Sequence, residues 1–326
     1  MELAKPVSID REALDEMAEA PTAAKLRKFI EEIYDRGTIR GEDGTEHQIY
    51  PESVTPDRGA FVRDLCHTER TESVLEVGLA WGISALHIQE ALLSNGGSAH
   101  THVVLDPKQT SVYQDVGSQM LRDAGVEPLI EFHQAYSELL LPQLVSEGRV
   151  FDFVFIDGSH RFDHVFVDLF YANRLLKPGG LVLFDDVFAE AVNLVCRYAK
   201  TNYGYTAVAQ LPAEAPAFDD DSVPADWRPV MVALRKPAEE VRLAPFQFVR
   251  FFPLAQQAEQ NSEEHSAPPP PEDPKPEVNA GLLRRNARHA LREGDRAAAR
   301  KDLVEALRLE PSHLKNYLRL LKTFLP

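Results

Sequence analysis

Residues 151–187 read FDFVFIDGSHRFDHVFVDLFYANRLLKPGGLVLFDDV, and this stretch decides the fold. It contains two short apolar runs, at 152–157 and 180–186, separated by a helical pattern at 165–176. Each run has the length of a buried strand and ends in aspartate. Two such strands joined through a helix lie parallel in one sheet, so this stretch predicts a strand–helix–strand unit.

The same alternation continues on both sides of this unit. Further strand candidates are SVLEVG (73–78), HVVLD (102–106), IEFHQ (130–134), YTAV (205–208) and VMVALR (230–235), with helical patterns at 57–67, 83–93 and 113–124. Apolar strands separated by helices indicate a parallel sheet that is covered on both faces. We therefore predict an α/β fold: a Rossmann-like, doubly wound, mostly parallel seven-stranded sheet. Two short N-terminal helices are expected within residues 10–36.

A glycine-containing turn, VLEVGLAWGIS at 74–84, joins the first strand of the predicted sheet to the helix that follows. Gly78 and Gly82 let the backbone approach a ligand at the carboxyl edge of a parallel sheet. Asp106 ends the second strand, where an acid can accept hydrogen bonds from both ribose hydroxyls of an adenosine. A tight turn and a helix N-cap are the structural alternatives for the glycines and for Asp106.

Three aspartates end the two strands of the first stretch. Asp157 closes one strand, and Asp185 and Asp186 close the next. Neighbouring strands lie about 4.8 Å apart, so these carboxylates converge at one edge of the sheet. Their mutual repulsion is relieved by a divalent cation, and an all-oxygen set suits Mg²⁺, Mn²⁺ or Ca²⁺. Helix caps and loop hydrogen bonds are the alternative role for the three.

His160 follows Asp157 by three residues, in the sequence DGSH. A histidine can take a proton at neutral pH, and beside a metal it could deprotonate a substrate hydroxyl. The alternatives are a surface histidine and one that supports a metal ligand without acting on the substrate.

The glycine turn with its acids resembles the first motif of class I S-adenosylmethionine-dependent methyltransferases. The resemblance implies that S-adenosylmethionine is the cofactor and that the adenine side of its site includes the segment QAYSELLLPQL, 134–144. The residues that it implies for cofactor binding are Glu76, Gly78, Gly82, Ser84, Asp106, Ser137 and Asp157.

Over about residues 46–236, the chain resembles the metal-dependent small-molecule O-methyltransferases of the cephalosporin and macrocin type. The catechol and caffeoyl-coenzyme A methyltransferases are more distant relatives. This resemblance implies that Asp157, Asp185 and Asp186 hold Mg²⁺ or Mn²⁺ and that His160 is the catalytic base. It also makes KPGG, at 177–180, a turn into the fifth strand.

Composition divides the chain into four parts. We predict an N-terminal helical cap (1–45), a methyltransferase domain (46–255), a Pro-rich linker (256–278) and a helical tail (279–326). The tail resembles a single tetratricopeptide repeat, which does not bury its packing face alone. We therefore expect it to pack on the main domain, on a following helix at 314–324 or on another subunit, and a second copy of the chain or a protein partner is possible there. Eleven Lys or Arg against five Asp or Glu give the tail a net charge of +6. The remaining residues carry a net charge of −22, and the two sum to the −16 of the whole chain.

Charge and composition narrow the function classes. An acidic body repels phosphate backbones, which disfavours nucleic acid as the main partner. The N-terminal residues lack a secretory apolar core and no apolar run is long enough for a membrane helix, so a cytoplasmic location is expected. The leading hypothesis is methyl transfer to a hydroxyl of a small molecule. An RNA methyltransferase and a non-catalytic methyltransferase-like binding module are the alternatives.

Overall fold

The computed structural model describes residues 21–96, 100–239, 241, 247, 249–251 and 301. The chain divides into two units, Met1–Pro253 and Leu254–Pro326. The predicted linker and tail, and the first of the two N-terminal helices, lie outside the described residues apart from Lys301.

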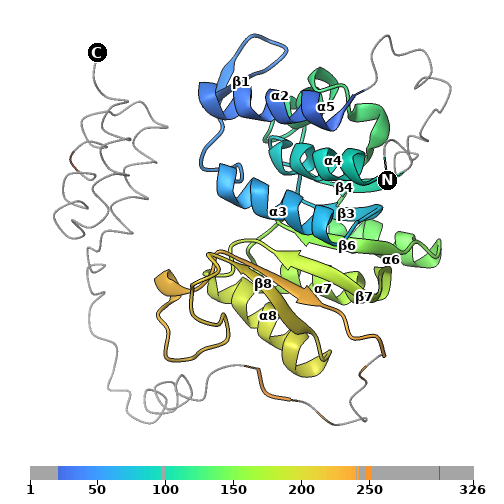
Figure 1. Ribbon diagram of the computed structural model, residues 1–326, viewed down its shortest axis with the longest axis vertical. Coiled ribbons are helices and arrows are strands. Elements are labelled where there is room, and N and C mark those ends of the chain that lie inside the picture. Colours follow the sequence, from blue (N-terminus) through green and yellow to red (C-terminus); the bar gives the residue numbers. More distant parts are fainter. Residues whose placement is uncertain are drawn as a thin grey trace, which may run out of the picture. The chain divides into compact units, whose positions relative to one another are not determined.

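Seven strands form one sheet in the order β5-β4-β3-β6-β7-β9-β8 (Figure 1). The five strands from β5 to β7 are parallel, whereas β9 is antiparallel to both β7 and β8. The mostly parallel seven-stranded sheet is therefore confirmed. The strands are β3 (Ser73–Val77), β4 (Thr101–Leu105), β5 (Glu131–His133), β6 (Phe151–Ile156), β7 (Leu176–Phe184), β8 (Thr206–Leu211) and β9 (Met231–Arg235).

Helices cover both faces of the sheet, as a doubly wound fold requires. They are α2 (Ala23–Arg36), α3 (Pro56–Thr68), α4 (Ile83–Gly96), α5 (Val116–Asp123), α6 (Ser137–Ser146), α7 (Phe162–Leu175) and α8 (Glu190–Asn202). Alternate residues of β6 show the two cores: Val154 packs with α6, α7 and α8, and Phe155 packs with α3 and α4. Because side chains alternate along a strand, β6 contributes to the core on each face of the sheet.

Strand register places the ends of three strands side by side. Ile156 pairs with Val77 on one side and with Phe184 on the other. The backbone ladder continues one step beyond, because the Asp157 N–H donates to Val77 and the Asp185 N–H to Ile156. The residues that follow β3, β6 and β7 therefore meet at one carboxyl edge.

Three local features differ from the sequence-based expectations. Strand β7 begins at Leu176, so KPGG lies within the strand, opposite a register shift in β6. Helix α5 begins at Val116, after Gln114 and Asp115 take left-handed backbone conformations. A small hairpin, β1 (Thr38–Arg40) with β2 (Glu46–Gln48), was not predicted.

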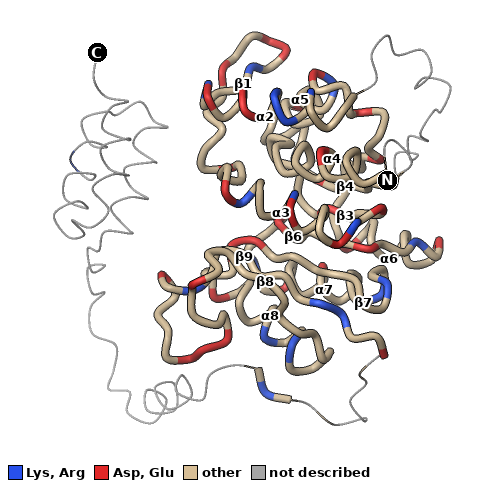
Figure 2. The backbone as a smooth tube through the Cα atoms, in the orientation of Figure 1, with Lys and Arg blue, Asp and Glu red and all other residues tan. Residues whose placement is uncertain are grey.

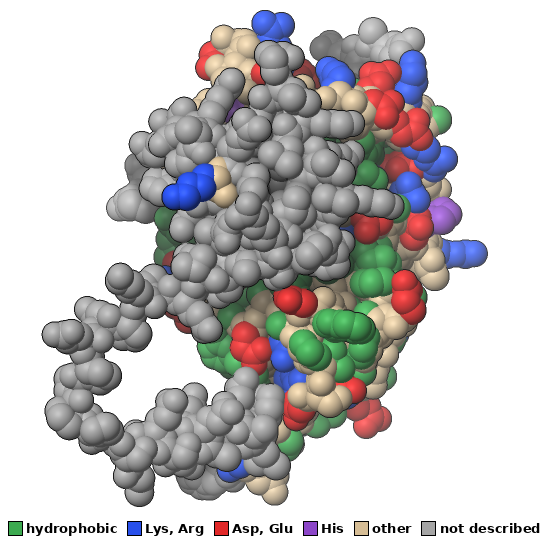
Figure 3. All heavy atoms as spheres, turned by 90° about the vertical axis from the view of Figure 1, so that its left-hand side faces the viewer, with side chains coloured by type: hydrophobic (Ala, Val, Ile, Leu, Met, Phe, Trp, Pro, Cys, Tyr) green, Lys and Arg blue, Asp and Glu red, His purple; other side chains and the backbone are tan. Residues whose placement is uncertain are grey.

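Acidic and basic side chains are interspersed along the described backbone (Figure 2). On the face shown in Figure 3, the described side chains of both signs alternate with apolar ones. Among the described residues, no helix combines the length and the apolar character needed to cross a bilayer.

We expect Gly59→Ala to destabilise the contact between α3 and α4. A Cβ at Gly59 would lie 2.2 Å from Nε2 of His87, whose buried ring is held by the Tyr34 hydroxyl at 3.1 Å. Displacing this ring should lower the free energy of unfolding by about 1–3 kcal/mol, in spite of the better helix propensity of alanine.

Denaturant unfolding measures this effect. Gly96→Ala is the matched control, because a Cβ at Gly96 in α4 would meet nothing within 4 Å. Equal stability of the Gly59 variant and the wild type would contradict the close packing of the two helices.

Candidate active site at the carboxyl edge of the sheet

Two cavities open at the carboxyl edge and share part of their walls. One has a volume of about 610 Å³ and the other about 270 Å³. The larger lies within the usual range of small-ligand sites, about 300–1,000 Å³. The residues that line both are Gly78, Ala80, Tyr113, Asp157, Gly158 and His160. A ligand in one cavity would therefore meet a ligand in the other beside Asp157 and His160.

The predicted cofactor residues divide between these cavities. Asp106 and Ser137 line the larger cavity alone, and Ser84 lines the smaller. Glu76 and Gly82 line neither cavity, so their assignment to cofactor binding stays a prediction.

Glu76 is fully buried inside the sheet. Its carboxylate accepts a hydrogen bond from the Ser84 hydroxyl at 2.5 Å and contacts Nε2 of His102 at 3.0 Å. The other ring nitrogen of His102 contacts the Gln89 side chain at 2.9 Å. Glu76 thus ties the first turn of α4 to strands β3 and β4, which fixes the glycine turn.

Both glycines of the turn have left-handed backbones, with φ of +102° at Gly78 and +84° at Gly82. A Cβ at Gly78 would lie 2.2 Å from the carbonyl oxygen of Asp157, so only glycine fits between β3 and β6. A Cβ at Gly82 would lie 3.1 Å from the carbonyl oxygen of Gly117. Gly82 therefore serves the conformation and packing of the turn.

Asp106 holds the glycine turn from the next strand. Its Oδ2 accepts hydrogen bonds from the backbone N–H groups of Leu79 and Ala80, at 3.1 and 2.9 Å. Its Oδ1 accepts one from the Lys108 N–H at 2.7 Å. Asp106 is therefore not a helix N-cap, because α4 begins at Ile83 and α5 at Val116; it binds the backbone of the glycine turn and also lines the larger cavity.

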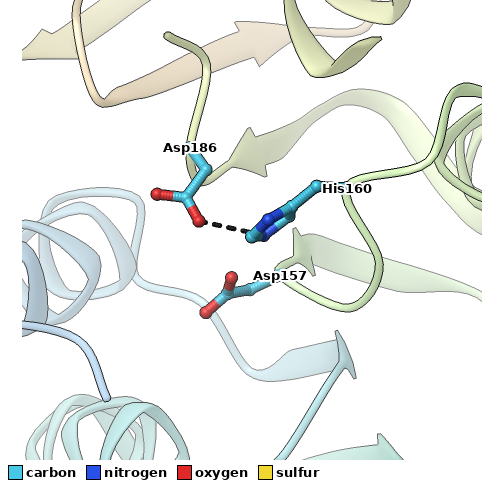
Figure 4. A group of neighbouring side chains, drawn as sticks. All are labelled: Asp157, His160 and Asp186. Atoms are coloured by element: carbon cyan, nitrogen blue, oxygen red, sulfur yellow. Dashed lines mark ion pairs between the residues drawn. The ribbon is translucent and has the colours of Figure 1, made fainter. Parts of the chain in front are cut away.

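The aspartates at the ends of β6 and β7 do converge. One carboxylate oxygen each of Asp157 and Asp186 and a ring nitrogen of His160 lie within 4.8 Å of one another (Figure 4). Nε2 of His160 is 2.9 Å from Oδ2 of Asp186. Asp186 reaches this position with a left-handed backbone, φ 53°, which aspartate tolerates better than most residues.

Arg58 in α3 meets the same cluster, and the sequence analysis missed it. Its Nη1 lies 3.0 Å from both carboxylate oxygens of Asp185 and 2.9 Å from Oδ1 of Asp186. One signal was available: an arginine in the first turn of a helix opposes the helix dipole, so its charge serves another purpose. Its partners, more than a hundred residues away in the chain, were not readable from the sequence.

Burial and charge shift the pKa values of this cluster in different directions. Burial and then the neighbouring carboxylates raise the pKa of Asp157 well above its ordinary value and that of Asp185 to about 6. At Asp186 burial acts in the same sense, but the His160 hydrogen bond and the Arg58 charge hold its pKa below the ordinary value. The same hydrogen bond raises the pKa of His160, which burial partly offsets.

Two further residues of the cavities were missed. Tyr113 lines both cavities and packs edge-to-face on Trp81, with ring centroids 5.0 Å apart. Asp168 in α7 lines the larger cavity, is 2% exposed, and its Oδ1 has no hydrogen-bond partner among the described residues. Burial raises the pKa of Asp168 to about 7, against a lowering by the Ser137 hydroxyl.

The family model and the curated proteins that this chain resembles are all described as methyltransferases. Residues 75–187 match the family model described as a methyltransferase domain. The chain is 31% identical over 140 residues to a catechol O-methyltransferase of Niastella koreensis. The aligned residues make up 42% of this chain and 59% of that protein. It is 29% identical over 137 residues to a caffeoyl-CoA O-methyltransferase of Populus kitakamiensis, and here the aligned residues make up 41% of this chain and 54% of the relative.

These matches therefore span little more than half the length of the two curated relatives. Among solved structures, the O-methyltransferase TomG of Streptomyces achromogenes, in complex with SAM, aligns with a TM-score of 0.46 at 20% identity. That alignment covers 70% of this chain and 96% of TomG.

We expect Asp168→Asn to change how stability depends on pH. The folded protein binds this proton more tightly than the unfolded chain, whose aspartate pKa is about 3.9. Stability from this group is therefore lost as the pH rises from about 4 through about 7. Asparagine does not titrate, so the variant should gain about 2–3 kcal/mol relative to the wild type between pH 5 and pH 8.

Urea unfolding at the two pH values measures the difference. Asp163→Asn is the control, since this aspartate lies on the same helix with 65% of its side chain exposed. A stability difference for Asp168→Asn that does not vary with pH would contradict a buried, protonated carboxyl group.

Proposed function

We propose that the protein is an S-adenosylmethionine-dependent O-methyltransferase acting on a hydroxyl of a small molecule. One observation carries the proposal. A cavity large enough for a nucleoside cofactor meets a second cavity at a wall that holds Asp157 and His160. The family match over residues 75–187 covers both the glycine turn and this wall. Catechol-like and caffeoyl-CoA-like hydroxyls, named for the two relatives, are the first acceptors to examine.

The larger cavity fits the parts of S-adenosylmethionine. Oδ2 of Asp106 already accepts from Leu79, Ala80 and, at 3.3 Å, the Gln109 side chain, whereas Oδ1 accepts from Lys108 alone and so keeps an acceptor site for a ribose hydroxyl. Ser137, Tyr136 and the buried carboxyl group of Asp168 supply polar and aromatic contacts for an adenine. Gly78 lines both cavities, so the methionine part would pass beneath it toward the second cavity. When bound, the cofactor supplies an electrophilic methyl group.

The smaller cavity fits a divalent cation and a hydroxyl acceptor. Asp157 and Asp186 would be the central metal ligands, and Asp185 lines the same cavity as a third carboxylate outside the converging group. Carboxylate oxygens of this kind suit Mg²⁺ or Mn²⁺. When bound, the cation would lower the pKa of the acceptor hydroxyl. Trp81 and Tyr113 line the same cavity and offer aromatic surfaces on which a planar acceptor can pack.

His160 is the residue we assign to proton removal. Its Nε2 faces Asp186, so the ring is oriented by the carboxylate and Nδ1 is the nitrogen that accepts a proton. Just over half of its side chain is exposed, so the ring can release the proton to water. Most of the rate enhancement then comes from holding the hydroxyl and the methyl group in line, a positioning task.

The two alternative functions predict different assays. An RNA methyltransferase would label tRNA in preference to phenolic acceptors, and a non-catalytic module would bind cofactor and label nothing. Incubation with methyl-labelled S-adenosylmethionine, a panel of catechol and caffeoyl-type acceptors, and tRNA separates the three. The proposed function requires label in a small acceptor, and its absence from every acceptor while cofactor binds would contradict it.

We expect Asp106→Asn to weaken binding of S-adenosylhomocysteine by about 10–100-fold, the value of one charge-assisted hydrogen bond. Isothermal titration calorimetry gives the dissociation constant directly. Asp123→Asn, which removes a charge from exposed α5, should bind as the wild type does. Unchanged affinity in the Asp106 variant would exclude this carboxylate from the cofactor site.

Replacement of His160 by alanine should lower the methyl-transfer rate by about 10²–10⁴-fold while sparing cofactor affinity, because general-base catalysis is worth that much. Hydroxide can replace the base, so the deficit should shrink at high pH. His67→Ala is the control, since this histidine contacts Asn95 and lines neither cavity. A rate loss that is the same at every pH would argue against a base at this position.

A further inference from the structure

The acidic cluster already holds a cation that belongs to the chain. Asp157, Asp185 and Asp186 bring three carboxylates to the small cavity, and Asp185 is only 4% exposed. Burying like charges is costly unless a positive group accompanies them. Arg58 reaches the cluster from α3 and contacts two of the three carboxylates.

Arg58 contacts the carboxylates through one nitrogen and not through the paired nitrogens that arginine usually uses. Arginine usually grips a carboxylate through two nitrogens, in a fork. Here one nitrogen, Nη1, lies at 3.0, 3.0 and 2.9 Å from three oxygens of Asp185 and Asp186. The guanidinium is thus placed as a single centre of charge among oxygens, and 21% of its side chain is exposed at the cavity wall.

The contacts of Arg58 use the same atoms that a metal would need. Both oxygens of Asp185 and Oδ1 of Asp186 accept from Nη1, and Oδ2 of Asp186 faces His160. A divalent cation bound to Asp185, or to Oδ1 of Asp186, would compete with the arginine for these oxygens and bring two positive charges close together. Since Arg58 lines the open cavity, its head group has room to withdraw.

We propose that Arg58 is an exchangeable counter-cation: it neutralises the carboxylates in the metal-free protein and is displaced when a divalent cation binds. This inference rests on the proposed function, which places the metal on these aspartates. Its consequence is a lowered metal affinity, because every binding event has to break the Arg58 contacts. It also lets the site keep its shape without metal.

Metal binding to the full chain tests the exchange. Titration of chelator-treated protein with Mn²⁺ should give a dissociation constant at least tenfold lower for Arg58→Gln than for the wild type. Arg58→Lys keeps the charge and should stay within about threefold of the wild type. Arg63→Gln removes the same charge from the same helix, where Arg63 pairs with Asp64 and Glu90, and should bind as the wild type does. Equal or weaker binding in Arg58→Gln would overturn the proposal.

Thermal unfolding supplies a readout that needs no activity. Arg58→Gln should melt at a lower temperature than the wild type in chelator, and Mn²⁺ should restore most of the difference. A loss of stability that Mn²⁺ does not restore would make Arg58 a fixed structural clamp and overturn the exchange. Where the single variant does not fold, Arg58→Gln with Asp185→Asn is compared with Asp185→Asn alone, and tighter Mn²⁺ binding in the double variant is again required.

Titration of the same samples with S-adenosylhomocysteine separates this inference from the proposed function. Firm binding of S-adenosylhomocysteine with no Mn²⁺ binding in any variant overturns the exchange and leaves the cofactor site standing. Tighter Mn²⁺ binding in Arg58→Gln without affinity for S-adenosylhomocysteine supports the exchange and contradicts methyl transfer.

Discussion

The convergence of carboxylates at the ends of β6 and β7 is the constraint on which the site depends. Parallel strands in register end together, so Asp157 and the Asp185–Asp186 pair occupy one edge of the sheet, where Asp185 is buried. Like charges at that spacing require compensation. The chain supplies it from two separate elements, Arg58 in α3 and His160 in the loop before α7. The residues that neutralise the buried carboxylates are therefore the same residues that determine the chemistry of the site.

The glycine turn ties cofactor binding to the same edge. Only glycine fits at Gly78, because the backbone of Asp157 passes directly beside it. Asp106 fixes the turn through two backbone N–H groups, and Glu76 fixes the helix that follows. A group that holds the turn and also faces the cavity, such as Asp106, affects stability and affinity together. Variants at this position consequently need both measurements.

Sequence patterns predicted the sheet and the convergence of the aspartates because both depend on local order: an apolar run followed by an acid at each strand end. They missed Arg58 and Asp168, whose roles depend on which helix faces which strand end, and that is decided by tertiary packing. The spacing at Gly82 suggested a ligand contact, and the left-handed backbone and the approach to Gly117 are a further, sufficient reason for a glycine there. Of the two glycines in the turn, Gly78 lines both cavities and Gly82 lines neither.

A crystal structure with S-adenosylhomocysteine and Mn²⁺, with anomalous data collected at the manganese edge, tests the central claim most directly. We expect the nucleoside in the cavity beside Asp106 and an anomalous peak within coordination distance of Asp157 and Asp186, with the Arg58 guanidinium withdrawn from Asp185 and Asp186. An empty nucleoside cavity at millimolar S-adenosylhomocysteine, or Arg58 still in contact with both carboxylates and no peak beside them, would contradict it.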